Sequence, residues 1–188
     1  MSFKLKGVEL GKFGSPPGGT PSAPVDFFNP NPMLILSNLK KSGAINGTGS
    51  FSGDFRVPNT LDGDLHLDLS KVVIEQQSLA GFALPRMSVS EGKIEVATEK
   101  GKLLFKNVKL GKAGDDLRAT VTGDMVLGKS WDSSIVNAKV NFSLSEGVTK
   151  ALVLVDALLA PGKQPDGSYT YTLAGALSGP PVPTPGGK

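Results

Sequence analysis

The chain has 188 residues, with 20 lysines and arginines against 17 acidic residues, one histidine and no cysteine. The absence of cysteine excludes disulfides, thiolate zinc sites, iron–sulfur clusters and cysteine nucleophiles, and a single histidine excludes a histidine-rich metal site. The net charge of +3 is small and only 6% of the residues are aromatic, so a nucleic-acid-binding surface is not expected. Composition therefore disfavours most enzymes and predicts no cofactor, no metal and no nucleic-acid partner.

The N-terminal part combines one predicted strand with one predicted loop. Residues 3–10 alternate apolar and polar side chains directly after Met1, without the apolar core of a signal peptide. Residues 14–32 are rich in proline and glycine, and proline lacks the N–H that a central strand needs, so a long loop is predicted. No apolar run approaches the ~20 residues that cross a bilayer. We therefore expect membrane attachment only through an anchor absent from this chain.

The central part alternates with period two, which predicts half-buried strands joined into an antiparallel meander. Glycine-containing turns are expected at residues 91–92, 100–101 and 111–115. The predicted strands are residues 44–57, 61–69, 72–75, 87–90, 93–98, 102–106, 108–110, 116–127, 134–145 and 168–177.

One segment has helical spacing. Its apolar residues recur at intervals of three and four, Ser145 can cap its start and a Pro-Gly pair follows it, so a helix is predicted over residues 146–160. A buried strand at 151–155 is the alternative interpretation. Residues 178–188 are rich in proline and are expected to form a disordered tail. The sequence thus predicts a single β-domain over residues 1–177.

Two motifs suggest chemistry that their surroundings do not favour. Residues 123–130 match the phosphate-binding pattern GxxxxGK[ST], with Lys129 in the lysine position and Asp156 as a candidate magnesium ligand. However, the segment continues a strand and a further strand follows it, where a phosphate-binding loop needs a helix. Nucleotide binding therefore stays an alternative only.

A second pattern places Asp64, His66 and Asp68 on one side of a strand. Side chains two residues apart on a strand are ~7 Å apart, too far for three of them to meet one ion unaided. We interpret this pattern as a solvated strand face. No serine carries the nucleophile motif of a hydrolase, so no catalytic residue is assigned.

The main architectural feature is a set of strands with one apolar and one polar face, and only one short helix to cover the apolar side. A lipid, a protein partner or the sheet itself must cover that face. Glycines at inward positions (Gly47, Gly49, Gly53 and Gly63) leave it under-filled, as a strongly curved sheet with an acyl-chain groove would require. The residues expected to line the face are Leu65, Leu67, Leu69, Ile94, Val96, Leu103, Phe105, Val121, Met125, Val140 and Phe142.

Several of these strands resemble a known family. The opening strand is similar to that of AsmA-like periplasmic proteins, and later strands with their Gly-x-Leu-x-Leu and Leu-Pro patterns resemble the type II secretion system protein N family, GspN. The residues that carry the resemblance are 3–10, 63–69, 79–85, 87–129 and the closing strand at 169–181.

The resemblance implies a mainly β, bent or folded-over antiparallel sheet (AsmA-like, β-taco-like) with one short helix in its C-terminal half. It further implies a non-enzymatic periplasmic accessory of type II protein secretion, anchored in the inner membrane in its full-length form. Its expected partners are other secretion-system or envelope proteins, and lipid at the apolar face. A lipid-binding or lipid-transport module unrelated to secretion is the alternative.

Overall fold

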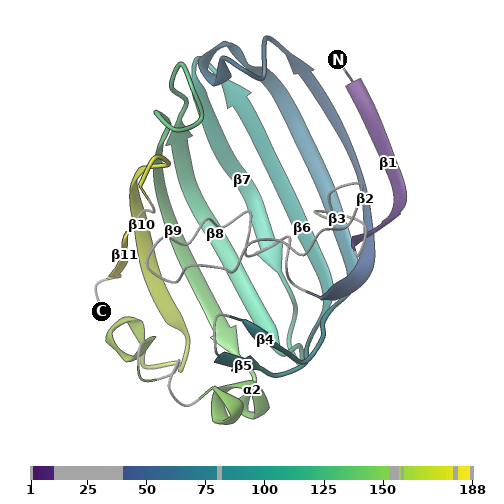
Figure 1. Cartoon of the computed structure of the whole chain (residues 1–188), viewed down its shortest axis with the longest axis vertical. Coiled ribbons are helices and arrows are strands. Elements are labelled where there is room, and N and C mark those ends of the chain that lie inside the picture. Colours follow the sequence, from purple (N-terminus) through teal and green to yellow (C-terminus); the bar gives the residue numbers. More distant parts are fainter. Residues whose placement is uncertain are drawn as a thin grey trace.

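The computed structural model describes residues 2–10, 40–79, 82–152, 157, 159–179 and 182–186 (Figure 1). Nine of its strands form one antiparallel sheet in the order β1-β2-β3-β6-β7-β8-β9-β10-β11. The predicted fold, a mainly β, curved antiparallel meander, is confirmed. These strands are β1 (Ser2–Glu9), β2 (Lys41–Ser52), β3 (Asp62–Ile74), β6 (Met87–Glu99), β7 (Lys102–Leu110), β8 (Leu117–Val126), β9 (Ile135–Leu144), β10 (Tyr169–Ala176) and β11 (Val182–Pro185).

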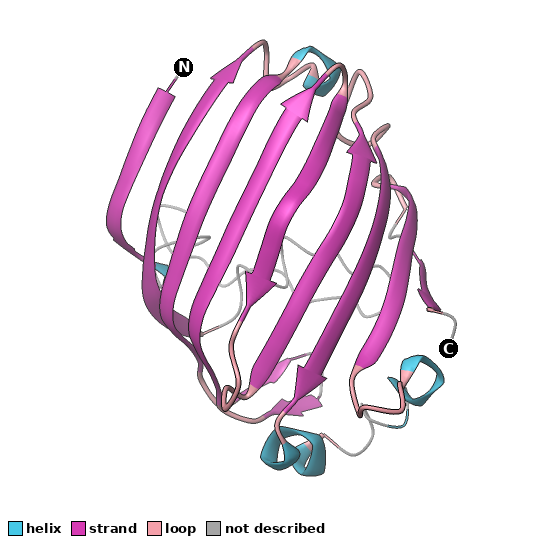
Figure 2. Cartoon of the chain, turned by 180° about the vertical axis from the view of Figure 1, so that it is seen from behind, coloured by secondary structure: helices cyan, strands magenta, loops and turns pink. Residues whose placement is uncertain are grey.

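The sheet is curved and open, with β1 and β11 as its two edges (Figures 1 and 2). Figure 1 looks onto its concave side and Figure 2 onto its convex side. A small hairpin of β4 (Gln77–Leu79) and β5 (Phe82–Leu84) lies at one end, where the short helix α2 (Glu146–Ala151) also lies. Two 3-10 turns, η2 (Pro58–Thr60) and η3 (Ala160–Gly162), complete the described elements.

Two of the three predicted turns are confirmed and one is wrong. Residues 111–115 lie in the turn between β7 and β8, where Gly111 has a φ of 72°. Lys100 and Gly101 both have positive φ (49° and 73°) and join β6 to β7, as a two-residue hairpin turn requires. By contrast, β6 runs straight through Glu91 and Gly92. A Cβ on Gly92 would lie 2.7 Å from the side chain of Leu110 on the adjacent strand, so this glycine serves close side-chain packing.

The sequence predicted a break within β3 and another within β7, but both strands are continuous and only their local geometry is irregular. Lys71 has a φ of 50° but leaves β3 unbroken. In β7 the register shifts between Leu104 and Val108, which marks a β-bulge. The bulge changes which residues face each side, so Leu103 and Val108 share a face although they are five positions apart.

Carboxylates hold the end of the sheet near α2. Both the N–H and the hydroxyl of Ser88 donate to Asp116 Oδ2 at 2.8 Å, and Ser90 makes the equivalent pair to Asp115. The hydroxyl of Ser145 donates to Asp116 Oδ1 at 2.9 Å. This pair of acidic residues therefore ties the start of β6 to the start of β8 and to α2.

The predicted helix starts where expected, and α2 covers its first part; Ala157 and Leu159, near its predicted end, are helical as well. Ser145 is its N-cap and accepts a hydrogen bond from the N–H of Val148, and α2 ends at Ala151 with Leu152 as C-cap. Residues 153–156 and 158 of the predicted helix lie outside the described residues, as does the predicted loop at 14–32.

The predicted disordered tail contains a strand, so this expectation is corrected. Val182–Pro185 forms β11, which pairs antiparallel with β10. Its two prolines are compatible with this position because β11 is an edge strand, whose outward side needs no hydrogen-bond donor.

Candidate functional site

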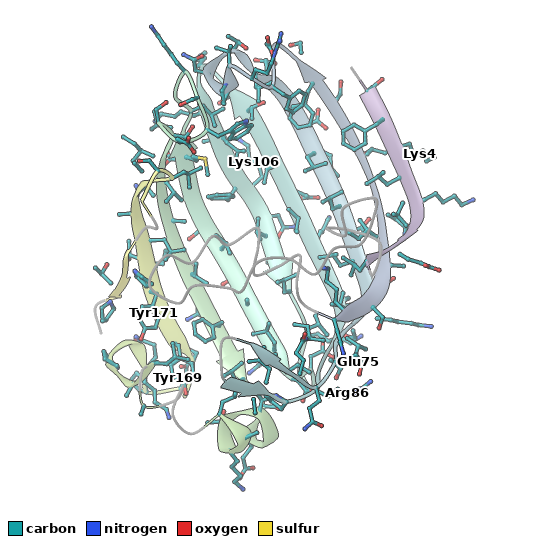
Figure 3. All side chains as sticks on the ribbon, in the orientation of Figure 1. Lys4, Glu75, Arg86, Lys106, Tyr169 and Tyr171 are labelled. Carbon is teal, nitrogen blue, oxygen red and sulfur yellow. The ribbon has the colours of Figure 1, made fainter. Side chains whose placement is uncertain are left out.

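The eleven residues predicted to line an apolar surface all lie on one face of the sheet. Directly opposite residues of adjacent strands point the same way, and the register pairs Leu65 with Val96 and Val121 with Val140. The remaining pairings place the other predicted residues in the same rows: Leu67 with Ile94, Leu69 with Gly92, Val96 with Phe105, Leu103 with Met125 and Ala119 with Phe142. Tyr171, which is labelled in Figure 3, lies opposite Val140 and shares this face, which we call the concave apolar face.

Small residues make this face uneven. Gly47 stands between Leu5 and Leu67, and a Cβ on it would lie 2.6 Å from the side chain of Leu67. Gly63 also faces inward, opposite Phe51. Gly53 does not, because β2 ends at Ser52. The inward glycines therefore allow neighbouring large side chains to lean over them.

An apolar hollow of about 380 Å³ opens on this face at the C-terminal side of the sheet. Its lining is apolar apart from one phenol hydroxyl, that of Tyr171, which donates to the carbonyl oxygen of Leu159 at 3.0 Å. Figure 3 places Tyr169 and Tyr171 along β10. The residues that line the apolar hollow are Val140, Phe142, Leu159, Tyr171, Leu173 and Pro183.

Aromatic rings form one side of the hollow. The ring of Phe142 stacks on that of Tyr169, with centroids 5.1 Å apart, and lies 6.5 Å from that of Tyr171. Tyr169 and Tyr171 are buried, with 1% and 9% of their surface exposed. Such stacking holds the rings in place, so this side of the hollow is preformed.

Only two of the eleven residues predicted for the apolar face line the hollow. Val140 and Phe142 line it, whereas the other predicted residues lie on the same face without lining it. Tyr171 and Leu173 were missed, although they continue the alternation of β10. Leu159 is a helical residue near the end of the predicted helix, and Pro183 comes from the proline-rich C-terminal segment. Neither pattern indicated that these two side chains would reach the apolar face of the sheet.

The convex face is polar and carries the Asp64, His66 and Asp68 pattern. His66 lies between two carboxylates, with Nε2 3.3 Å from Asp64 Oδ2 and Nδ1 3.6 Å from Glu95 Oε1. A hydrogen bond from Lys93 is the main cause that lowers the pKa of Glu95. No group of three or more metal-binding side chains occurs in the part of the chain that the structure describes.

The segment that matches a phosphate-binding loop has the wrong structure for one. Gly123 belongs to β8, which continues to Val126, and the next regular element after Ser130 is strand β9. The loop-to-helix geometry that presents backbone N–H groups to phosphates is therefore absent from this fully described segment.

Comparison of the chain with protein-family models, curated proteins and solved structures yields no match. Among the described residues, no helix has both the length and the apolar character needed to cross a membrane.

Proposed function

We propose that the protein is a non-enzymatic binding protein whose apolar hollow receives an extended hydrocarbon chain, such as the acyl chain of a lipid. The observation that carries this proposal is the lining of the hollow. Its one polar side-chain group, the Tyr171 hydroxyl, already donates to Leu159, so an aliphatic occupant leaves no polar group newly unsatisfied. Its volume of about 380 Å³ lies within the range of small-ligand sites.

The setting we propose is the bacterial periplasm, where the protein assists type II secretion and is attached to the inner membrane in its full-length form. The resemblance of its strands to the GspN family supports this setting. A lipid-binding module unrelated to secretion would use the same hollow, and an apolar segment of an envelope protein is the alternative occupant. Osmotic-shock fractionation of cells expressing the full-length gene tests the setting. Release of the protein with the periplasmic fraction, or its retention on the periplasmic side of the inner membrane, supports the setting, and a cytosolic protein contradicts it.

Titration with a fluorescent fatty acid tests the binding function. Leu173 lines the hollow, whereas its neighbour Thr172 lies opposite Lys139 on the convex face. We expect Leu173→Glu to weaken binding at least about tenfold, because a carboxylate would be buried against hydrocarbon.

The matched control is Thr172→Glu, which adds the same charge to the same strand on the other face. It should bind within about twofold of the wild type, since a tenfold change needs ~1.4 kcal/mol and this site is remote from the hollow. Circular dichroism of both variants shows that the sheet is intact. Equal affinities of the two variants, or no saturable binding by the wild type, would contradict the proposal.

A further inference from the structure

A second hollow, of about 380 Å³, lies across β7, β8 and β9, and its more polar lining distinguishes it from the apolar hollow. In this region the register places Lys109 opposite Thr120 and Thr120 opposite Asn141, while Arg118 lies opposite Ser143. These residues alternate along their strands with members of the concave apolar face, so they belong to the convex face. We call this the basic hollow; its lining includes Lys109, Lys112, Arg118, Thr120, Asn141, Ser143, Asp166 and Ser168.

Two cations in the basic hollow are free of ion pairs. Lys112 lies 3.6 Å from Glu91, but within the residues described no carboxylate lies within 4.0 Å of Lys109 or Arg118. The positive charge of both side chains is thus available to a ligand.

The one carboxylate of the basic hollow, Asp166, is already engaged. Its Oδ1 accepts from the hydroxyl and the N–H of Ser168 at 2.7 and 2.9 Å. These hydrogen bonds are the main cause that lowers the pKa of Asp166, and the charge of Arg118 adds to the effect. The amide of Asn141 is also held, since it donates to Ser168 and Thr170. The floor of the hollow is therefore ordered.

The remaining polar side chains can all donate a hydrogen bond. Neither the hydroxyl of Thr120 nor that of Ser143 makes a side-chain hydrogen bond within the described part of the chain. A guanidinium, an ammonium and two hydroxyls on one surface match the donor set that proteins use for phosphate oxygens. We propose that the basic hollow binds a phosphate group, in a site separate from the apolar hollow.

The rest of the convex face favours this location. The adjoining strands β3 and β6 present three carboxylates, Asp64, Asp68 and Glu95, against the cation Lys93, which pairs with Glu95, whereas the basic hollow has three cations and one carboxylate. The charges on this face therefore favour an anion at β7–β9, where Lys109 and Arg118 lie, over β3 and β6.

Titration with inorganic phosphate at constant ionic strength, followed by amide chemical shifts, tests this proposal. Saturable shifts are expected around Thr120 and Ser143. The double variant Lys109→Gln/Arg118→Gln should weaken binding at least about tenfold, as the loss of two charge-assisted contacts implies.

The control is Lys100→Gln/Lys129→Gln, which removes the same charge from the turns at the other end of the sheet and should change affinity less than about twofold. Absence of saturable shifts, shifts spread evenly over all lysines, or equal losses in both double variants would overturn the proposal. The chemical-shift dispersion of the same spectra shows whether each of the two double variants is folded.

The source of the phosphate is distinguished by sedimentation with vesicles. Binding to vesicles that contain phosphatidylglycerol but not to pure phosphatidylcholine, lost in Lys109→Gln/Arg118→Gln, supports a lipid headgroup as the phosphate source. Binding of inorganic phosphate without vesicle binding supports a soluble phosphate ligand. If neither probe binds, the proposal is wrong.

Discussion

The hydroxyl of Tyr171 donates a hydrogen bond to the carbonyl oxygen of Leu159 across 3.0 Å. This contact joins strand β10 to the residue that precedes the 3-10 turn η3, although the two residues are twelve positions apart. Leu159 forms one wall of the apolar hollow, so the contact holds that wall against the sheet. The shape of the hollow therefore depends on a tyrosine whose ring is also part of its lining.

Tyr171→Phe separates these two roles. It removes the hydrogen bond but keeps the ring, so we expect the free energy of unfolding to fall by about 0.5–1.5 kcal/mol while fatty-acid affinity changes only a few-fold. Urea denaturation followed by the fluorescence of Trp131, the single tryptophan, measures the first quantity.

Leu159→Ala is the matched comparison, because it keeps the carbonyl acceptor and shortens the wall. It should weaken fatty-acid binding more than Tyr171→Phe does. The opposite order would show that Leu159 does not form part of the binding surface.

Asp116 is expected to make the stability of the protein sensitive to acid. The hydroxyl and N–H of Ser88, and the hydroxyl of Ser145, donate to its carboxylate, and these hydrogen bonds hold its pKa below the ordinary value. Because the folded pKa is depressed, this contribution is fully present above the unfolded pKa of ~3.9 and is lost as the pH falls through the folded value.

Asp116→Asn should therefore be less stable than the wild type at pH 7, and the difference should shrink as the pH falls below about 4. Urea midpoints measured from pH 7 to pH 2.5 provide the test. Asp132→Asn, in an exposed loop, is the control and should follow the wild type throughout. A difference between Asp116→Asn and the wild type that stays constant with pH would refute the linkage.

Two glycines should respond oppositely to alanine. Gly123 lies in β8 with a φ of 120°, and a Cβ there would collide with the carbonyl oxygen of Asn137. Gly147 lies in helix α2, and apart from its chain neighbours and the backbone of its own helix nothing lies within 4 Å of the position that an alanine methyl would take there. Gly123→Ala should lower the free energy of unfolding by about 1–3 kcal/mol, and Gly147→Ala should raise it by about 0.5–1 kcal/mol. Thermal denaturation of both variants measures the shifts, and equal signs would contradict the backbone assignment.

Much of the fold could be predicted because strand alternation is a local property. Leu65, Leu67 and Leu69 alternate with polar residues, so their shared face follows from the sequence alone. The bulge in β7 could not be located in this way, because it depends on how the neighbouring strands pair. The wrong prediction of a turn at Gly92 has the same cause. A glycine required for packing and a glycine required for a turn cannot be distinguished in the sequence, and only the register places Leu69 and Leu110 beside Gly92.

The apolar hollow was less predictable than the face around it. Val140 and Phe142 follow from the alternation of β9, but Leu159 and Pro183 reach the hollow through tertiary contacts that the patterns of their own segments do not specify. Proline-rich composition favoured a disordered tail, and only pairing with β10 turns residues 182–185 into an edge strand. The basic hollow likewise depends on register, since Lys109, Arg118 and Ser143 are distant in sequence.

Native mass spectrometry of the gently purified protein tests the central claim most directly. We predict a species that carries one bound lipid, or that acquires one when a fatty acid or phospholipid is added, and we predict that Leu173→Glu loses this species while Thr172→Glu keeps it. A wild-type protein that carries no lipid and takes up none when it is offered would contradict the assignment of the apolar hollow as a hydrocarbon-binding site.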